Sequence, residues 1–469
     1  MRQLESLKKV IVLQLNLGGL LLQTSVFAYA WYNIYADQVE ASRGYIKFWG
    51  KGNLVIVFLY FILLFFFSKT YGGTKTGYYR PFEVFLSNIF ALLCVCMVSF
   101  LQIALMAVWP VRVWPQYIMP MIYVTLINIV IAGTWAFLCQ KIYQKVFPPK
   151  KLLLVHGDRS IETILEKFDS RKDKYKIENC VHVSAGKDEI IKELGCGYSG
   201  IILWDIPFQD RNELMKYCYS HNIRIYMMPK IPDVLVKGAS QLHLFDTPIL
   251  MIREYALTVE QRIVKRTIDI VFSLLLLIIT SPFMLLTAIC VKAYDRGPVL
   301  YKQVRCTQDG KEFKIIKFRS MRVDAERDGV ARLASKNDDR ITPIGKFIRK
   351  VRLDELPQLW NIFVGDMSFI GPRPERPEII KQYMEEMPEF AYRLKVKAGL
   401  AGFAQVYGKY NTTPYDKLKL DLFYIENYSV WLDLKLMLLT LKILVTPDAT
   451  EGVENNQITA LKQKMEEEK

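Results

Sequence analysis

Two adjacent carboxylates, Asp354 and Glu355, have the residue types and spacing best suited to chemistry in this sequence. Neighbouring carboxylates supply hard oxygen ligands for a divalent cation. An Asp-Glu pair just before a proline also occurs at ordinary helix starts, where the helix dipole favours acidic side chains. Here three basic residues stand immediately upstream, and they favour a functional site over a plain helix start: Arg349, Lys350 and Arg352.

Basic side chains in nearby phrases suit the recognition of phosphate. Lys317 and Arg319 belong to a short strand-to-turn phrase, and Arg373 stands between two prolines that restrict its backbone. Together with Arg352 they offer charged donors for phosphate oxygens, although a solvated basic surface or a contact to lipid head groups remains an alternative. Asp366 either joins this site or serves as a turn residue that bonds nearby backbone amides.

Composition indicates a membrane protein with several parts. The chain has 469 residues, too many for one ordinary core. It combines 51% hydrophobic residues and a mean hydropathy of +0.13 with a net charge of +15. In this apolar context the positive charge favours anionic lipids and phosphorylated substrates as partners, not nucleic acid. The eight cysteines lack paired metal spacing and are expected to be structural.

Long apolar segments near the start of the chain predict four membrane-spanning helices. Each approaches the length needed to cross a bilayer. Basic residues that flank the segments predict that both chain ends of this region lie in the cytoplasm, by the positive-inside rule. The segments are 10–31, 53–67, 83–109 and 117–139.

A fifth apolar run, 268–294, is long enough to cross a bilayer but carries Ser281 and Pro282 in its middle. Proline removes a helix hydrogen bond and kinks the helix. Basic residues flank both ends of the run, so the charge rule holds both ends in the cytoplasm. We therefore expect a re-entrant helix that dips into the bilayer and returns at this break, with a fifth kinked span as the alternative.

Between the fourth and fifth apolar segments, residues 151–253 alternate short β-like runs with helical stretches, which predicts an α/β domain. Its first strand is followed by the phrase 157–160, Gly-Asp-Arg-Ser, which lacks the second and third glycines of a dinucleotide site. We expect a nucleotide-type fold that serves regulation or assembly.

Several phrases in the last third of the chain together resemble one family. They are Lys-Phe-Arg-Ser-Met at 317–321, Arg-Leu-Asp-Glu-Leu-Pro-Gln at 352–358, Gly-Asp-Met-Ser at 365–368, Gly-Pro-Arg-Pro at 371–374 and the stretch 397–408. In this order they closely resemble the bacterial polyprenyl-phosphate hexose-1-phosphate transferases, or monotopic phosphoglycosyl transferases. The resemblance covers about 262–445. Two positions depart from the usual pattern, Ala401 and Lys409, and weaken any inference about sugar preference.

The resemblance implies a reaction. A UDP-sugar and undecaprenyl phosphate would give undecaprenyl-diphosphate-sugar and UMP, with Mg²⁺ as cofactor and glucose or galactose as the expected sugar. Asp354 would be the nucleophile, and Glu355 would help to bind the metal and position or deprotonate the lipid phosphate. This would be the first membrane step of exopolysaccharide, capsule or O-antigen synthesis, at the cytoplasmic face of the bacterial inner membrane.

The expected fold is therefore a membrane α-helical bundle at 1–145, a Rossmann-like α/β domain at 146–257 and an α-rich monotopic catalytic domain at 258–447 with its re-entrant helix. A polar tail, 448–469, would follow. The helix expected at 430–445 would lie in the membrane interface.

Other interpretations of the whole chain remain open. A non-catalytic scaffold or regulator of polysaccharide assembly is one alternative, and a multi-span phosphoglycosyl transferase is another. A homo-oligomer is also compatible with the sequence.

Overall fold

The computed structural model describes residues 2–43, 50–244, 246–322, 340–408 and 412–445. The chain divides into two compact units, Met1–Met228 and Pro229–Lys469. Lys409 and the tail 448–469 lie outside the described residues. The four-part division expected from the sequence stays a prediction.

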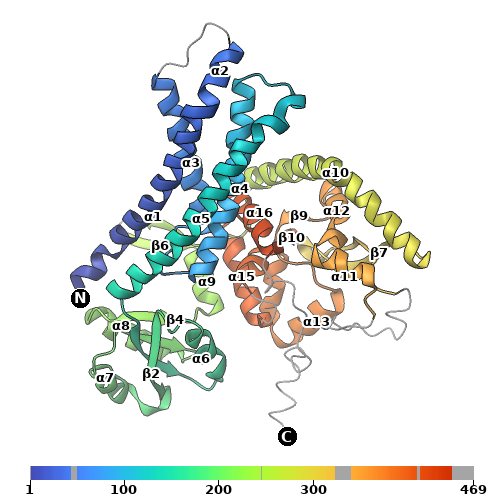
Figure 1. Cartoon of the computed structure of the whole chain (residues 1–469). Helices are drawn as coiled ribbons and strands as arrows, with labels where there is room; N and C mark the ends of the chain where they lie inside the picture. The colour runs from blue at the N-terminus through green and yellow to red at the C-terminus, as the bar shows by residue number, and fades with distance from the viewer. Residues whose placement is uncertain (1, 44–49, 245, 323–339, 409–411, 446–469) are drawn as a thin grey trace. The chain divides into compact units, whose positions relative to one another are not determined.

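Long apolar helices form the first part of the N-terminal unit (Figure 1). Their inward faces share one core, which includes Phe27, Leu64, Val95 and Met121, while many apolar side chains on the other faces are exposed. Each helix is long and apolar enough to cross a membrane. They are α1 (Arg2–Ala30), α3 (Gly50–Tyr71), α4 (Pro81–Met106) and α5 (Trp114–Val146).

The first helix extends further than its predicted end at Trp31. It continues through a π-helical turn, η1 (Trp31–Tyr35), into α2 (Ala36–Arg43). Trp31 and Tyr35 are completely buried, and the Trp31 indole donates a 2.9 Å hydrogen bond to Asn53 Oδ1. The polar atoms of these aromatic side chains have hydrogen-bond partners inside the bundle. The run of apolar residues therefore predicted a first helix that is too short.

A four-stranded parallel sheet follows, with strand order β2-β1-β3-β4. Four consecutive residues of β1, 152–155, are completely buried, as expected for a strand covered on both faces. The α/β alternation predicted for this region is present, and its relation to nucleotide-binding folds stays a prediction. The elements are β1 (Lys150–His156), α6 (Glu162–Asp169), β2 (Tyr175–His182), α7 (Lys187–Leu194), β3 (Gly200–Trp204), α8 (Phe208–Ser220) and β4 (Arg224–Met227).

The C-terminal unit is rich in helices and contains small sheets. The strands pair as β5-β6 and β7-β8, both antiparallel, and as β9-β10, which is parallel. The helices are α9 (Ile231–Lys237), α10 (Val259–Asp295), α11 (Pro343–Lys350), α12 (Gln358–Val364), α13 (Pro377–Glu386), α14 (Phe403–Tyr407), α15 (Pro414–Glu426) and α16 (Val430–Val445). The strands are β5 (Ser240–Leu244), β6 (Thr247–Met251), β7 (Leu300–Cys306), β8 (Glu312–Phe318), β9 (Ser368–Ile370) and β10 (Gly399–Ala401).

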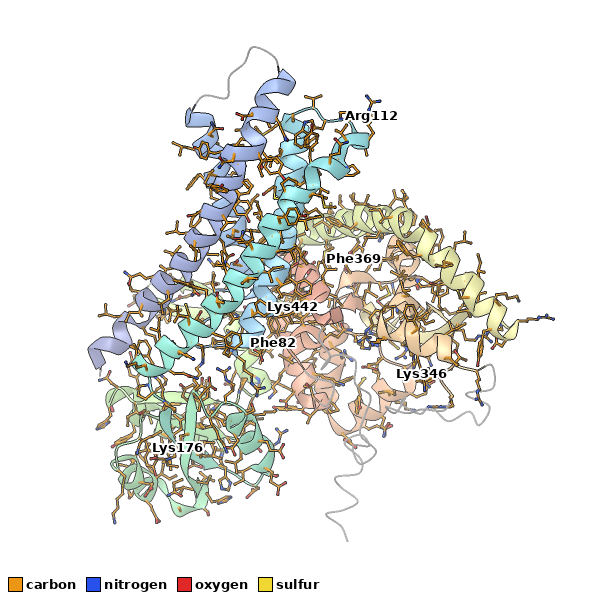
Figure 2. All side chains as sticks on the ribbon, viewed as in Figure 1. Phe82, Arg112, Lys176, Lys346, Phe369 and Lys442 are labelled. Atoms are coloured by element: carbon orange, nitrogen blue, oxygen red, sulfur yellow. The ribbon has the colours of Figure 1, made fainter. Side chains whose placement is uncertain are left out.

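The predicted break at Ser281 and Pro282 is a bend within one continuous helix, α10 (Figure 1). Pro282 has no N–H to donate to the carbonyl of Ile278, four residues earlier. The Ser281 hydroxyl donates to that carbonyl instead, at 2.8 Å. The Ser-Pro pair therefore bends the helix while the freed carbonyl keeps a partner, and many apolar side chains of α10 stay exposed (Figure 2).

A buried ion pair fixes the first third of α10 to the rest of the unit. Lys265 lies 2.6 Å from Asp433 of α16, measured between Nζ and Oδ2. The same Nζ donates to the carbonyl of Ile370 at 2.9 Å and to the Tyr424 hydroxyl at 3.1 Å. Since Lys265 and Asp433 are both buried, these extra bonds satisfy charges that water cannot reach.

Asp269, one turn further along α10, holds strand β9. Its Oδ1 accepts hydrogen bonds from the Ser368 hydroxyl and from the backbone N–H of Phe369, both at 3.0 Å. Phe369 is labelled in Figure 2. The loop that follows β9 carries Arg373, so the polar side chains of α10 fix the strand from which that loop begins.

Candidate active site

Asp354 and Glu355, the carboxylate pair, lie on a tight turn between two helices. Helix α11 ends at Lys350, a 3₁₀ turn η5 covers Leu353–Glu355, and α12 begins at Gln358. Arg352 precedes the turn with φ 58° and ψ 21°, the left-handed region that residues other than glycine rarely adopt. Such backbone strain clusters at functional sites, where the surrounding structure enforces it.

Asp354 is a buried carboxyl group that is short of partners. Its side-chain atom Oδ1 has no hydrogen-bond partner within the described residues. Burial, and then the charge of Glu355, raise the pKa of Asp354 to about 6, against the opposing pull of Lys317, Arg349 and Arg352. Asp354 therefore has a buried oxygen whose hydrogen-bonding capacity is not used by any described residue.

Glu355, in contrast to Asp354, has a carboxylate with cationic partners. Its Oε1 accepts from Lys317 Nζ at 2.9 Å and lies 3.6 Å from Arg373 Nη2. Burial alone would raise the pKa of Glu355, but the charges of Lys317, Arg373 and Arg352 outweigh burial and hold that pKa far below its usual range. Two neighbouring carboxyl groups with separated pKa values are suited to two different roles.

The cations around Glu355 come from separate segments. Lys317 lies near the end of β8, which pairs in antiparallel register with β7. Arg373 lies in the loop after β9, between Pro372 and Pro374, and half of its side chain is exposed (47%). The structure thus gathers Lys317, Arg352 and Arg373 around the carboxylate pair, a cluster of positive charge suited to phosphate oxygens.

Two residues predicted for the site have other partners. Arg319 is buried and pairs with Asp295 at the end of α10. The Oδ2 atom of Asp366 accepts from the side-chain amide of Asn361, Nδ2, at 3.1 Å, which is a side-chain partner and not the backbone amides considered for a turn residue. Among the described residues, neither side chain forms a hydrogen bond or ion pair with the carboxylate pair.

Sequence reasoning missed two residues that the structure brings into view. Gln358, the first residue of α12, is only 3% exposed, and its Nε2 has no hydrogen-bond partner in the described part of the chain. Gln358 ends the phrase 352–358 that carries the family resemblance, but it was not assigned to the site from the sequence. Asp295, the partner of Arg319, follows an apolar helix by sequence and carried no such signal.

The comparisons with known proteins agree on one family. The family model "Bacterial sugar transferase" matches residues 260–447. A UDP-glucose:undecaprenyl-phosphate glucose-1-phosphate transferase of Caulobacter vibrioides is 38% identical over 189 residues, which cover 39% of this chain and 70% of that protein. The chain therefore belongs to the bacterial sugar transferase family.

Larger relatives match over a smaller share of their length. A UDP-N-acetylgalactosamine-undecaprenyl-phosphate N-acetylgalactosaminephosphotransferase of Aeromonas hydrophila is 36% identical, over 49% of this chain and 54% of that protein. A UDP-glucose:undecaprenyl-phosphate glucose-1-phosphate transferase of Klebsiella pneumoniae is 41% identical, over 44% of this chain and 43% of that protein. The chain thus matches about half the length of these curated relatives.

Proposed function

We propose that this protein transfers a hexose 1-phosphate from a UDP-sugar to undecaprenyl phosphate and releases UMP. The observation that carries the proposal is the carboxylate pair: a buried Asp354, with an oxygen that no described residue bonds, stands beside a Glu355 that is surrounded by cations. The names of the relatives support the class of donor and acceptor.

Asp354 is the nucleophile of the proposed reaction. Its carboxylate oxygen attacks the sugar-bearing phosphorus of the UDP-sugar, a new oxygen–phosphorus bond forms, and the bond to the UMP phosphate breaks. An oxygen of the lipid phosphate then attacks the same phosphorus and releases the Asp354 carboxylate. A relay of this kind divides one difficult displacement between two anions into two easier ones.

Glu355 and its cations supply the electrostatic part of the mechanism. Lys317, Arg352 and Arg373 offset the negative charge that the two substrates bring to the site. Glu355 stays ionised and keeps these cations in place. It also positions the incoming lipid phosphate, while its low pKa makes it a weak base for the proton of that phosphate.

Magnesium fits the residues present. Asp354 Oδ1 is a buried acceptor without a partner in the part of the chain that the structure describes, and Glu355 is adjacent in sequence. No cluster of three or more His, Cys, Asp or Glu side chains occurs among the described residues, and the Asp354–Glu355 pair would supply carboxylate ligands to the ion. Mg²⁺ usually binds through one or two carboxylates with water and substrate phosphates. When bound, the ion would neutralise phosphate charge.

A re-entrant path for α10 is part of the proposal. Near its start, Arg266 donates to the carbonyls of Ile362 and Phe363 at the end of α12, at 2.7 and 2.6 Å. At its end, Asp295 pairs with Arg319 beside β8. Because both ends bind the same unit, a helix that crossed the bilayer would pull one end away from its partners.

The topology test uses cysteine accessibility in the full chain. The exposed cysteines Cys180, Cys196 and Cys290 are first changed to serine. Single cysteines at the exposed positions Val259 and Tyr294 are then labelled from one side of the membrane at a time. Labelling of both from the cytoplasmic side supports the re-entrant helix, and labelling from opposite sides rejects it.

The transfer assay tests the function itself. Purified protein is mixed with Mg²⁺, undecaprenyl phosphate and one radiolabelled UDP-sugar at a time: glucose, galactose or N-acetylgalactosamine. We expect glucose or galactose to give labelled lipid and UMP in equal amounts, as the first membrane step of exopolysaccharide, capsule or O-antigen synthesis. If none of these or other UDP-hexoses gives lipid product, the proposal is wrong and a scaffold role gains support.

A further inference from the structure

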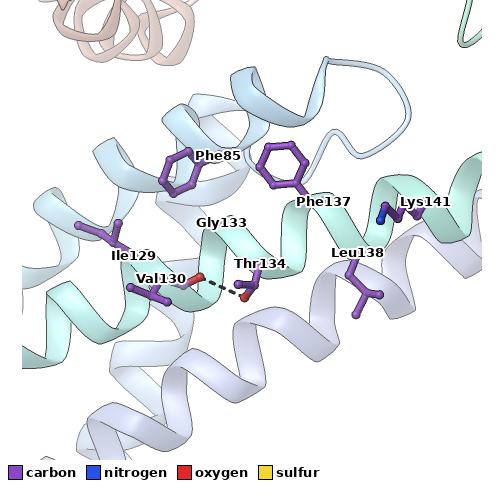
Figure 3. A pocket seen from close by; sticks show the side chains of 8 residues that line it. All are labelled: Phe85, Ile129, Val130, Gly133, Thr134, Phe137, Leu138 and Lys141. Carbon is purple, nitrogen blue, oxygen red and sulfur yellow. Dashed lines mark hydrogen bonds between the residues drawn. The ribbon is translucent and has the colours of Figure 1, made fainter.

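An open groove lies along α5 in the N-terminal unit (Figure 3). Its volume of about 620 Å³ is in the size range of small-molecule sites. Val130, Thr134, Phe137 and Leu138 recur at helical spacing along one face of α5, and Phe85 of α4 forms the opposite wall. The groove is therefore a feature of two packed helices.

The groove is apolar along most of its length. Val130, Phe137 and Leu138 are 64%, 50% and 48% exposed. The hydroxyl of Thr134 is used inside the helix, because it donates to the Val130 carbonyl at 3.1 Å (Figure 3). Gly133 leaves room at the floor, since an added Cβ would lie 3.1 Å from the Phe85 ring. Such a surface suits a hydrocarbon chain.

One end of the groove is basic. Lys141, at the end that leads toward β1, carries the only charge among the eight residues that line the groove. It is exposed and has no hydrogen-bond or ion-pair partner in the described part of the chain. Lys145 follows one turn later, where the apolar part of α5 ends. Basic sites at the ends of membrane helices attract anionic lipid head groups.

The dimensions match one leaflet of a bilayer. From Ile129 to Lys141 the lining covers 12 helical steps, or about 18 Å at about 1.5 Å per residue. Half of a hydrocarbon core is about 15 Å thick. A chain that fills the groove would thus place its head group beside Lys141.

We propose that this groove binds one acyl chain of an anionic phospholipid, with the lipid phosphate beside Lys141. The charge complementarity and the single-leaflet length favour a phospholipid over a much longer polyprenyl chain. The site lies outside the proposed catalytic residues, so it stands or falls independently of the transfer reaction.

Native mass spectrometry of the full chain in detergent tests the site. The protein is titrated with phosphatidylglycerol and, separately, with the zwitterionic lipid phosphatidylcholine. We expect Lys141→Ala to weaken phosphatidylglycerol binding about fivefold and Lys141→Arg to restore it. Lys145→Ala, on the same helix but outside the groove lining, is the matched control.

A second pair of variants tests the apolar part. Val130→Trp fills the groove and should reduce the retention of both lipids, whereas Leu126→Trp, one turn earlier and also exposed, should not. Equal affinities for Lys141→Ala and Lys145→Ala overturn the proposal. So does displacement of phosphatidylglycerol by an equal amount of undecaprenyl phosphate, or disulfide cross-linking of Val130→Cys between two copies, because each identifies another occupant.

Discussion

Two lysine–carboxylate pairs in the C-terminal unit have similar geometry but different surroundings. Lys265 and Asp433 are 2.6 Å apart, and Lys317 and Glu355 are 2.9 Å apart. The lysine of the first pair also binds a backbone carbonyl and a tyrosine hydroxyl, whereas beside the second pair the Asp354 oxygen Oδ1 has no partner among the residues described. A saturated polar network is suited to hold the fold, and an unsaturated one keeps an atom available for a ligand.

The largest expected effect is a loss of folding stability when the Lys265–Asp433 pair is broken. Lys265→Ala leaves Asp433 buried without its cation and should lower the free energy of unfolding by about 3 to 5 kcal/mol. Thermal or chemical unfolding of the detergent-solubilised protein measures this loss. The double variant Lys265→Met with Asp433→Leu, which removes both charges, should recover most of it. If the single variant is as stable as the wild type, the pair has no structural role.

Breaking the second pair should affect chemistry more than stability. Lys317→Met removes a cation from the site, and we expect kcat for sugar-phosphate transfer to fall about 10²- to 10³-fold. Arg373 and Arg352 remain to compensate Glu355, so the melting temperature should change little. Lys314→Met, an exposed lysine on the same strand, is the control. If Lys317→Met lowers the stability as much as Lys265→Ala does, the two pairs do not differ in their structural role.

The ionised form of Asp354 should lower the free energy of unfolding. Its folded-state pKa of about 6 lies above the ordinary value of 3.8, so the carboxylate is disfavoured in the fold at neutral pH. Asp354→Asn should therefore raise the free energy of unfolding by about 1 to 3 kcal/mol at pH 7.5. The gain should shrink as the pH falls below about 6 and vanish below 3.8, where the carboxyl group is protonated in both the folded and the unfolded state. Asp366→Asn serves as the comparison, and equal shifts in both variants would argue against strain at Asp354.

The smallest effect is expected in the dependence of kcat/KM on pH. A nucleophilic Asp354 must be ionised, so kcat/KM should rise with pH up to about 6 and then level off. At pH 5 it should be about tenfold lower than on the plateau, since one pH unit below the pKa leaves about a tenth of the carboxyl groups ionised. A profile that is flat down to pH 5 would separate the titration of Asp354 from the reaction.

The parts of this molecule that were predictable are those with local patterns. The apolar helices and the α/β alternation follow from periodicity. The charged phrases around Asp354 and Glu355 pointed to one cluster, and Lys317 and Arg373 do contact Glu355. The roles of these residues in catalysis stay predictions.

Long-range polar pairings could not be predicted in the same way. Lys265 and Asp433 are 168 residues apart, and nothing in either local sequence distinguishes a buried lysine from a flanking charge at a membrane helix. Arg319 was expected to bind phosphate because it lies in a basic sequence motif. Its partner Asp295 comes close to it only because α10 packs against β8 in the folded unit. Such partners depend on packing, which has no local period.

The covalent intermediate is the most direct test of the central claim. The full chain is incubated with Mg²⁺ and the preferred UDP-sugar labelled with ³²P at the sugar-bearing phosphorus, without lipid acceptor, and then digested for mass spectrometry. We predict a phosphosugar on the peptide that contains Asp354, its absence in Asp354→Asn, and its release on addition of undecaprenyl phosphate. Transfer to lipid by the Asp354→Asn variant, or a label on another residue, would contradict the account.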